Sequence, residues 1–147
     1  MNDLQVYIDE IVRKAKSMKG VSFRLPYGPD VLSIEIIGKQ FCLIDLSKKW
    51  DFYNLKCQPE LSEKLRWYFS GIRPGFHMNK THWNSVDFDG DCPMALQYML
   101  LRHAYLQTLK GLAKKDKTAL YGSSEAFDTK YEKQLSEISK FLEKTYL

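Results

Sequence analysis

The strongest constraint on the fold is a helix predicted over residues 93–112, in which apolar side chains occupy most of the circumference. Pro93 is compatible with the first helical turn, and Asp91 precedes it as a candidate capping residue. Because such a helix is apolar nearly all round, it has to be buried. A helix of this kind typically forms the centre of a two-layer α+β domain. The 147 residues, 44% of them hydrophobic, are enough for one ordinary domain.

The partner of that helix is predicted to be a sheet made of short strands. Segments with the apolar pattern of strands are residues 32–36, 41–46, 52–57 and 83–88. In the third segment Tyr53, Leu55 and Cys57 share one face, while Asn54 and Lys56 share the other, because side chains alternate along a strand. The apolar face is predicted to point into the core.

Further helices are predicted at both ends of the chain and after the third strand. Residues 3–18 carry apolar side chains at steps of three and four, and Pro59 opens a helix that ends before Gly71. Residues 114–123 are predicted to be a linker. The last helix carries a stripe of large apolar residues, namely Phe127, Tyr131, Leu135, Ile138, Leu142 and Tyr146. The chain is therefore divided into a domain at 1–113 and a linker with an amphipathic helix at 114–147.

The apolar stripe of the last helix has to be buried, since a lone helix of this length is marginal in water. Two arrangements are open: the helix docks on its own domain and the protein is a monomer, or it pairs with a second copy in a homodimer.

Composition limits the cellular setting and the partners. The sequence has no apolar run of 18 residues and no secretory leader pattern, so we expect neither a membrane span nor export. The three cysteines, Cys42, Cys57 and Cys92, form no CxxC pair, which favours a reducing cytoplasm. The formal net charge of +4 is compatible with a polyanionic partner but does not require one.

Motifs for cofactor or catalytic chemistry are weak. His77 and His82 are five residues apart with Cys92 further along, and these do not make a zinc-binding pattern. Neither a P-loop nor a GxGxxG motif occurs. Cys57 and Cys92 are candidate nucleophiles, but the sequence places no base beside them. We therefore expect no metal, no cofactor and no enzymatic activity.

The charge distribution of one segment is compatible with a nucleic-acid surface. No acidic residue occurs from Lys64 to Val86, and basic residues alternate there with aromatic ones. Basic groups beside aromatic rings suit contact with a phosphate backbone and stacking on bases. The candidate nucleic-acid-binding residues are Lys48, Lys49, Lys56, Arg73, Lys80 and Trp83. The other interpretation is that the aromatic residues are core and the lysines form a solvated face. Composition by itself favours this second interpretation, because the excess of basic residues over the whole chain is small.

Two stretches carry a resemblance to a known family. Residues 54–61, NLKCQPEL, and residues 73–86, RPGFHMNKTHWNSV, resemble the MmcQ/YjbR family, in which a lysine-bearing strand precedes PEL and a PG-[YF]-HMNK-x-HW motif follows. The resemblance covers about residues 3–113. Thr81 departs from it where the family often has lysine, and residues 114–147 extend beyond the usual end.

The resemblance implies a fold and a partner. The fold would be CyaY-like or double-wing, an α+β domain with an antiparallel sheet backed by helices. The function implied by the resemblance is DNA binding. If the basic residues named above share one face, we expect binding of duplex DNA with little sequence preference. Within the motif, Asn79 and at least one of His77 and His82 are predicted to organise a loop through hydrogen bonds to the backbone. The alternatives are a protein-interaction module that uses the C-terminal helix and a frataxin-like metal-handling protein.

Overall fold

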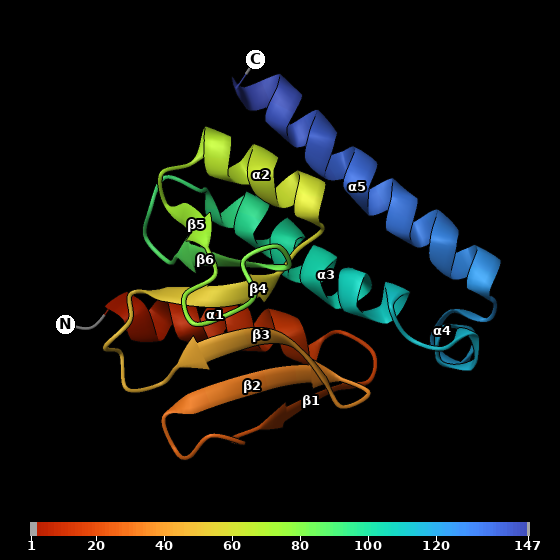
Figure 1. Cartoon of the computed structure of the whole chain (residues 1–147), viewed down its shortest axis with the longest axis horizontal. Helices are drawn as coiled ribbons and strands as arrows, with labels where there is room; N and C mark the ends of the chain where they lie inside the picture. The colour runs from red at the N-terminus through yellow and green to blue at the C-terminus, as the bar shows by residue number, and fades with distance from the viewer. Residues whose placement is uncertain (1–2, 147) are drawn as a thin grey trace.

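The computed structural model describes residues 3–146, and its centre is a six-stranded antiparallel sheet. The strand order is β1-β2-β3-β4-β6-β5, so that neighbouring strands in the sequence are mostly neighbours in the sheet (Figure 1). The strands are β1 (Val21–Arg24), β2 (Val31–Ile36), β3 (Lys39–Asp45), β4 (Phe52–Lys56), β5 (Ile72–Pro74) and β6 (Trp83–Asp87). The α+β class with an antiparallel sheet is confirmed.

Within residues 3–146 five helices accompany this sheet. They are α1 (Asp3–Lys16), α2 (Pro59–Tyr68), α3 (Met94–Lys110), α4 (Lys114–Tyr121) and α5 (Ser124–Tyr146). Helix α3 packs against β2, β3 and β4 and, on its other side, against α5. This double contact explains why α3 is apolar nearly all round. The predicted two layers become three, because α5 adds a layer outside α3.

Helix α5 buries its apolar stripe against its own domain. Phe127, Tyr131, Ile138 and Leu142 have at most 2% of their surface exposed, and Leu135 is half-buried. The side chain of Tyr146 lies outside the described residues. Tyr131 also donates a hydrogen bond from its hydroxyl to the Gln107 side chain on α3. The stripe is therefore occupied within the chain, as the docking alternative requires, and pairing of two copies would need another surface.

The prediction of a linker at residues 114–123 is wrong, because the structure has helix α4 there. Lysine, alanine and leucine all have good helix propensity, and Gly122, at a φ of 87°, ends the helix. No residue of α4 is buried. A helix without a buried face needs no apolar stripe, and that stripe is the pattern by which a helix is recognised in a sequence. Its Tyr121 contacts Phe127 of α5 edge to face, with ring centroids 5.5 Å apart.

No helix within residues 3–146 is long and apolar enough to cross a lipid bilayer.

The hairpin between β2 and β3 contains a strained residue. Ile36 pairs with Lys39, which leaves Ile37 and Gly38 as a two-residue turn, and both have positive φ values of 49° and 73°. Such a turn strongly prefers Asn-Gly, and a β-branched residue with positive φ is a steric outlier. Ile37 is also 46% exposed, so little burial opposes the strain.

Replacing Ile37 with asparagine should therefore stabilise the protein by about 1 kcal/mol, or roughly 4 °C in Tm for a domain of this size. The measurement is thermal unfolding followed by circular dichroism. Ile37→Val is the matched control, since it keeps the branched Cβ and should leave Tm unchanged. A lower Tm for Ile37→Asn would show that the Ile37 side chain contributes more through its contacts than the turn loses through strain.

Candidate nucleic-acid interface

The candidate residues surround the sheet face that lies opposite α1 and α3, which we call the outer face. Strand β4 presents Phe52, Asn54 and Lys56 to the outer face, whereas its alternate residues Tyr53 and Leu55 are in the core. On the neighbouring strand β6, Asp87, Ser85 and Trp83 pair with these three outer-face residues in the same order. The register therefore brings the lysine-bearing strand and the HWNS part of the motif into direct contact.

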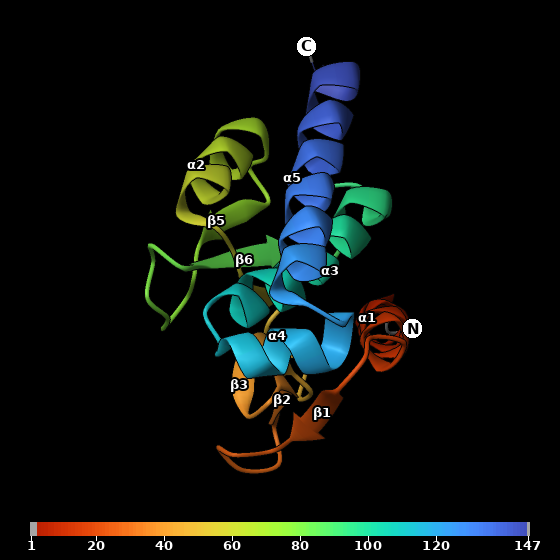
Figure 2. The ribbon, with the colours of Figure 1, turned by 90° about the vertical axis from the view of Figure 1, so that its right-hand side faces the viewer.

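The rest of the motif covers the outer face as a loop, residues 75–82, on the far side of the sheet from α1 (Figure 2). Three residues hold it there in a closed ring of hydrogen bonds. The Phe76 N–H donates to Ser85 Oγ at 2.9 Å, Ser85 Oγ donates to Asn54 Oδ1 at 2.6 Å, and Asn54 Nδ2 donates to the Phe76 carbonyl at 3.1 Å. Asn54, expected on a polar face, is only 1% exposed because the loop lies over it.

Gly75 lets the loop approach the sheet closely. A Cβ at this position would lie 2.7 Å from the Cβ of Trp83, which is closer than two carbon atoms can pack, and a tight 3.1 Å from the Trp83 carbonyl oxygen. The Gly75 N–H also donates to the Trp83 carbonyl at 2.9 Å. The glycine of the PG motif is therefore needed for the backbone to cross Trp83.

Arg66 on α2 holds the other end of the loop, although it is not among the predicted site residues. Its Nε donates to Asn84 Oδ1 at 2.7 Å, and a terminal nitrogen donates to the Lys80 carbonyl at 2.5 Å. This guanidinium is therefore largely occupied by the protein itself. In the sequence, Arg66 stands out only because it lies in the segment 64–86, which has no acidic residue. That position does not distinguish a structural role from a binding role.

Asn79 organises the loop as predicted. Its Oδ1 accepts hydrogen bonds from the backbone N–H groups of Thr81 at 2.9 Å and His82 at 3.3 Å. The predicted histidine contribution is not found, because neither histidine side chain of the loop makes a hydrogen bond within the described residues. His77 instead lies 4.0 Å from the Phe76 ring, centroid to centroid, and has a φ of 58°.

The aromatic side chains of the outer face form one cluster of Trp50, Phe52 and Phe76. Trp50 stacks on Phe52 with centroids 5.3 Å apart, and Phe76 meets both rings edge to face at 5.4 and 5.8 Å. Phe76 remains 43% exposed. The guanidinium of Arg73 lies 5.3 Å from the Phe52 centroid on the same face.

The predicted basic residues differ in how far they are free to bind a ligand. Arg73 is paired with Asp87 at 2.7 Å, and Lys80 Nζ donates to the Gly75 carbonyl at 2.8 Å. Lys48 and Lys49 lie in the turn between β3 and β4, before the start of β4. Trp83 is only 6% exposed, so its ring is not available for stacking on bases.

Lys56 has a special environment at the end of β4. Its ammonium lies 5.3 Å from the centroid of the Trp83 ring, which places a cation over an aromatic face. Burial, together with the nearby positive charge of Lys39, lowers the pKa of Lys56 below its usual value. Within residues 3–146 neither lysine has a carboxylate partner. Lys39 was missed by the sequence analysis because only the β3–β4 register brings it near Lys56.

The candidate nucleophiles Cys57 and Cys92 are buried in the core, whereas His77 and His82 are exposed on the loop. Burial raises the pKa of Cys57 to about 12, with small opposing effects from Ser62 and Arg66, and that of Cys92 also to about 12. Both thiols are therefore protonated at neutral pH and poor nucleophiles. In the part of the chain that the structure describes, no three His, Cys, Asp or Glu side chains gather as a metal site.

The fold and the motif loop together define a class, an antiparallel α+β domain whose outer sheet face is closed by a PG–HMNK loop. Comparison with known proteins is consistent with this class. The model of the YjbR family matches residues 16–107, and the chain belongs to that family.

Two of the matches to known proteins extend over more than three quarters of the chain, and a third extends over less than half. The uncharacterized protein YbdF of Escherichia coli O157:H7 is 33% identical over 114 residues, which are 78% of this chain and 93% of that protein. The uncharacterized protein YjbR of Escherichia coli K12 is 39% identical over 67 residues, 46% of this chain and 57% of that one. The crystal structure of Deinococcus radiodurans protein DR2400, with a DUF419 domain, has a TM-score of 0.71 and 30% identity and covers 77% of this chain and 86% of its own.

Proposed function

We propose that this protein binds duplex DNA through the outer face, with little sequence preference. The observation that carries the proposal is the Lys39–Lys56 pair. Lys56 is half-buried, and burial together with the nearby charge of Lys39 lowers its pKa. Within residues 3–146 neither lysine has a carboxylate partner, so an anion would stabilise the pair. A phosphate between them would relieve the repulsion.

The neighbouring groups extend this site into a surface of DNA size. Lys48 and Lys49 precede the five-residue strand β4, and Lys56 ends it, so the two groups are separated by roughly 15–20 Å. Several backbone phosphates span that distance. Lys80, whose ammonium donates one hydrogen bond to the Gly75 carbonyl, adds an exposed basic residue on the loop.

Little sequence preference is expected because the groups that could contact base edges are engaged. Arg73 is paired with Asp87, and Trp83 is covered. Specific recognition depends on hydrogen bonds to base edges, whereas phosphate contacts give affinity without sequence information. Phe76 is the exposed ring on this face, and it is suited to contact with a sugar or an unstacked base.

The test is fluorescence anisotropy of a labelled 20-base-pair duplex from about 20 to 200 mM salt. With about four phosphates neutralised, the slope of log K against log salt should be about −4. The double variant Lys39→Gln/Lys56→Gln should bind at least tenfold more weakly at low salt and reduce the slope by about 2. Lys140→Gln/Lys144→Gln on α5 removes the same charge from exposed positions outside the outer face and is the matched control.

Two results would overturn the proposal. One is the absence of binding even at about 20 mM salt. The other is an equal loss of affinity in the outer-face and α5 double variants, which would show attraction by net charge rather than by this face.

A further inference from the structure

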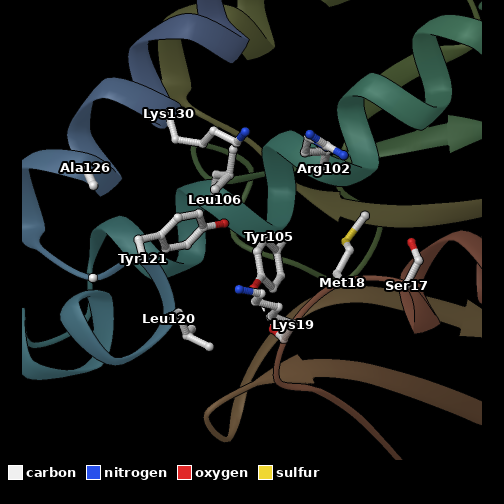
Figure 3. A pocket seen from close by; sticks show the side chains of 11 residues that line it. Ser17, Met18, Lys19, Arg102, Tyr105, Leu106, Leu120, Tyr121, Ala126 and Lys130 are labelled. Atoms are coloured by element: carbon white, nitrogen blue, oxygen red, sulfur yellow. Dashed lines mark hydrogen bonds between the residues drawn. The ribbon is translucent and has the colours of Figure 1, made fainter.

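A cavity of about 590 Å³ lies on the helical side of the sheet, among the segment after α1, α3, α4 and the start of α5 (Figure 3). Its size is within the range of pockets that bind small molecules. It shares no lining residue with the outer face, so it is independent of the proposed DNA interface. Its lining residues are Ser17, Met18, Lys19, Arg102, Tyr105, Leu106, Leu120, Tyr121, Gly122, Ala126 and Lys130.

One part of the cavity wall is apolar. Met18, Leu106, Leu120 and Ala126 contribute aliphatic or thioether surface from four different segments. Between them lie two tyrosines, and the hydroxyl of Tyr121 points toward Tyr105. The Tyr105 hydroxyl donates to the Lys19 carbonyl at 2.5 Å, which holds the segment after α1 against α3. The wall is therefore built from tertiary contacts and not from one flexible loop.

The charged part of the wall is entirely basic. Lys19, Arg102 and Lys130 come from three different segments, and none of the described residues that line the cavity is Asp or Glu. Within residues 3–146 none of the three makes an ion pair or a side-chain hydrogen bond. Figure 3 shows Arg102 and Lys130 on the same side of the cavity, above the two tyrosines. Three unpaired cations around an apolar hollow create a positive potential that an anion would neutralise.

A second observation points to a ligand in the same region. A smaller adjoining hollow of about 270 Å³ shares Ser17, Met18 and Arg102 with the first and is also lined by Gln134. Gln134 is 6% exposed, and its Nε2 has no hydrogen-bond partner within residues 3–146. A buried amide nitrogen without an acceptor is costly. An acceptor atom in the adjoining hollow would remove that cost. Glu137, the acidic residue of this hollow, is not among the residues that line the larger cavity.

We propose that this cavity binds a small organic anion with an apolar body, such as an aryl or alkyl carboxylate, sulfonate or phosphate. The anionic group lies against Arg102, Lys19 and Lys130, and the apolar body lies against Leu106 and Leu120. The YjbR family model ends at residue 107, whereas Leu120, Tyr121, Ala126 and Lys130 come after it. The site thus depends on the segment that follows the family core.

The experiment uses two matched fluorescent probes with the full-length protein. 8-Anilinonaphthalene-1-sulfonate carries an anionic group on an apolar body, and N-phenyl-1-naphthylamine has the same rings without the charge. The sulfonate should bind at one site with enhanced fluorescence and at least tenfold more tightly than the neutral probe. Arg102→Gln should weaken the sulfonate about tenfold and leave the neutral probe unchanged.

A second variant and a control separate this site from other causes of dye binding. Ala126→Trp places a large ring in the cavity and should abolish binding of both probes. Lys140→Gln, an exposed cation on the same helix that does not line the cavity, should leave both unchanged. Near-ultraviolet circular dichroism verifies that each variant is folded. Sulfonate binding that is absent, or that is unchanged in both Arg102→Gln and Ala126→Trp, would overturn the proposal.

Discussion

Replacing Phe127 with alanine should lower the free energy of unfolding by about 3–5 kcal/mol, a large part of the total stability of a domain of this size. Phe127 is fully buried, stacks on Tyr131 with centroids 6.1 Å apart, and meets Tyr121 of α4 edge to face. Its removal leaves a cavity where α4 and α5 meet. The measurement is urea unfolding at pH 7 monitored by circular dichroism.

The control for this variant lies on the same helix. Lys140→Ala changes an exposed residue of α5 and should alter the unfolding free energy by less than about 0.5 kcal/mol. Light scattering of both variants reports their mass. If Phe127→Ala converted a dimer to a monomer without loss of monomer stability, the stripe of α5 would be a pairing surface in solution, and the docking of α5 on α3 would be contradicted.

Acidification from pH 6.5 to 4 should destabilise the protein by about 3 kcal/mol through one residue, His103. Burial lowers the pKa of His103 to about 4, while the hydrogen bond to Gln134 opposes this shift. Its Nε2 accepts the Gln58 N–H at 3.0 Å, and its Nδ1 lies 3.2 Å from Gln134 Oε1, so the neutral ring links the start of α2 to α5. Protonation would put a charge in this core and remove the acceptor.

The sign follows from proton binding. In the unfolded chain the pKa of a histidine is about 6.5, so between pH 6.5 and 4 the unfolded state binds more protons than the folded state. The stability from His103 is complete above pH 6.5 and is lost as the pH falls toward 4. One pKa unit corresponds to about 1.4 kcal/mol, which gives the 3 kcal/mol stated above.

Urea unfolding at several pH values between 7 and 4.5 tests this expectation. His103→Gln should be less stable than the original protein at pH 7 but should lose about 2 kcal/mol less on acidification, since the titrating group is gone. His82→Gln changes a histidine on the exposed loop and should keep the original pH dependence. Parallel pH profiles for His103→Gln and the original protein would contradict the assignment to His103.

The elements that could be predicted from the sequence are those with a clear periodicity. Strands β2, β3, β4 and β6 and helices α1, α2, α3 and α5 were expected within a few residues of their observed positions. Strands β1 and β5 were missed because they are four and three residues long, too short for an alternating pattern to be distinctive. Pro74 at the end of β5 is compatible with a strand because β5 is at the sheet edge.

The sequence predicted which types of residue lie in the candidate site. It did not predict which of their side chains are free to contact a ligand. Lys56 and Trp83 were both expected on a binding surface, yet they pair across β4 and β6, and the ring is covered by its surroundings. Arg73 and Lys80 are likewise engaged by Asp87 and by the Gly75 carbonyl. A charge in a sequence carries no information about whether a partner from another segment neutralises it.

Asp91 illustrates the same limit for a helix end. It was a candidate capping residue for α3, but its carboxylate accepts the Ser70 and Gly71 N–H groups, each at 2.8 Å, and the residue before α3 is Pro93. A short acidic side chain before a helix satisfies the local rule for a cap. A backbone turn twenty residues away in the chain provided the donors instead.

Local periodicity and the family motif by themselves determined the class of fold, the central position of α3 and the positions of the main strands along the chain. These follow from which residues must leave water and at what spacing. Tertiary structure alone decided that Asn54 is buried beneath the loop, that Lys39 adjoins Lys56, and that α4 and α5 enclose a basic cavity with Arg102. Each of these depends on segments distant in the chain meeting at a fixed register. Whether a side chain is buried, and whether its charge is compensated, depends on which distant segments pack against it. Neither can be predicted from one segment of the sequence alone.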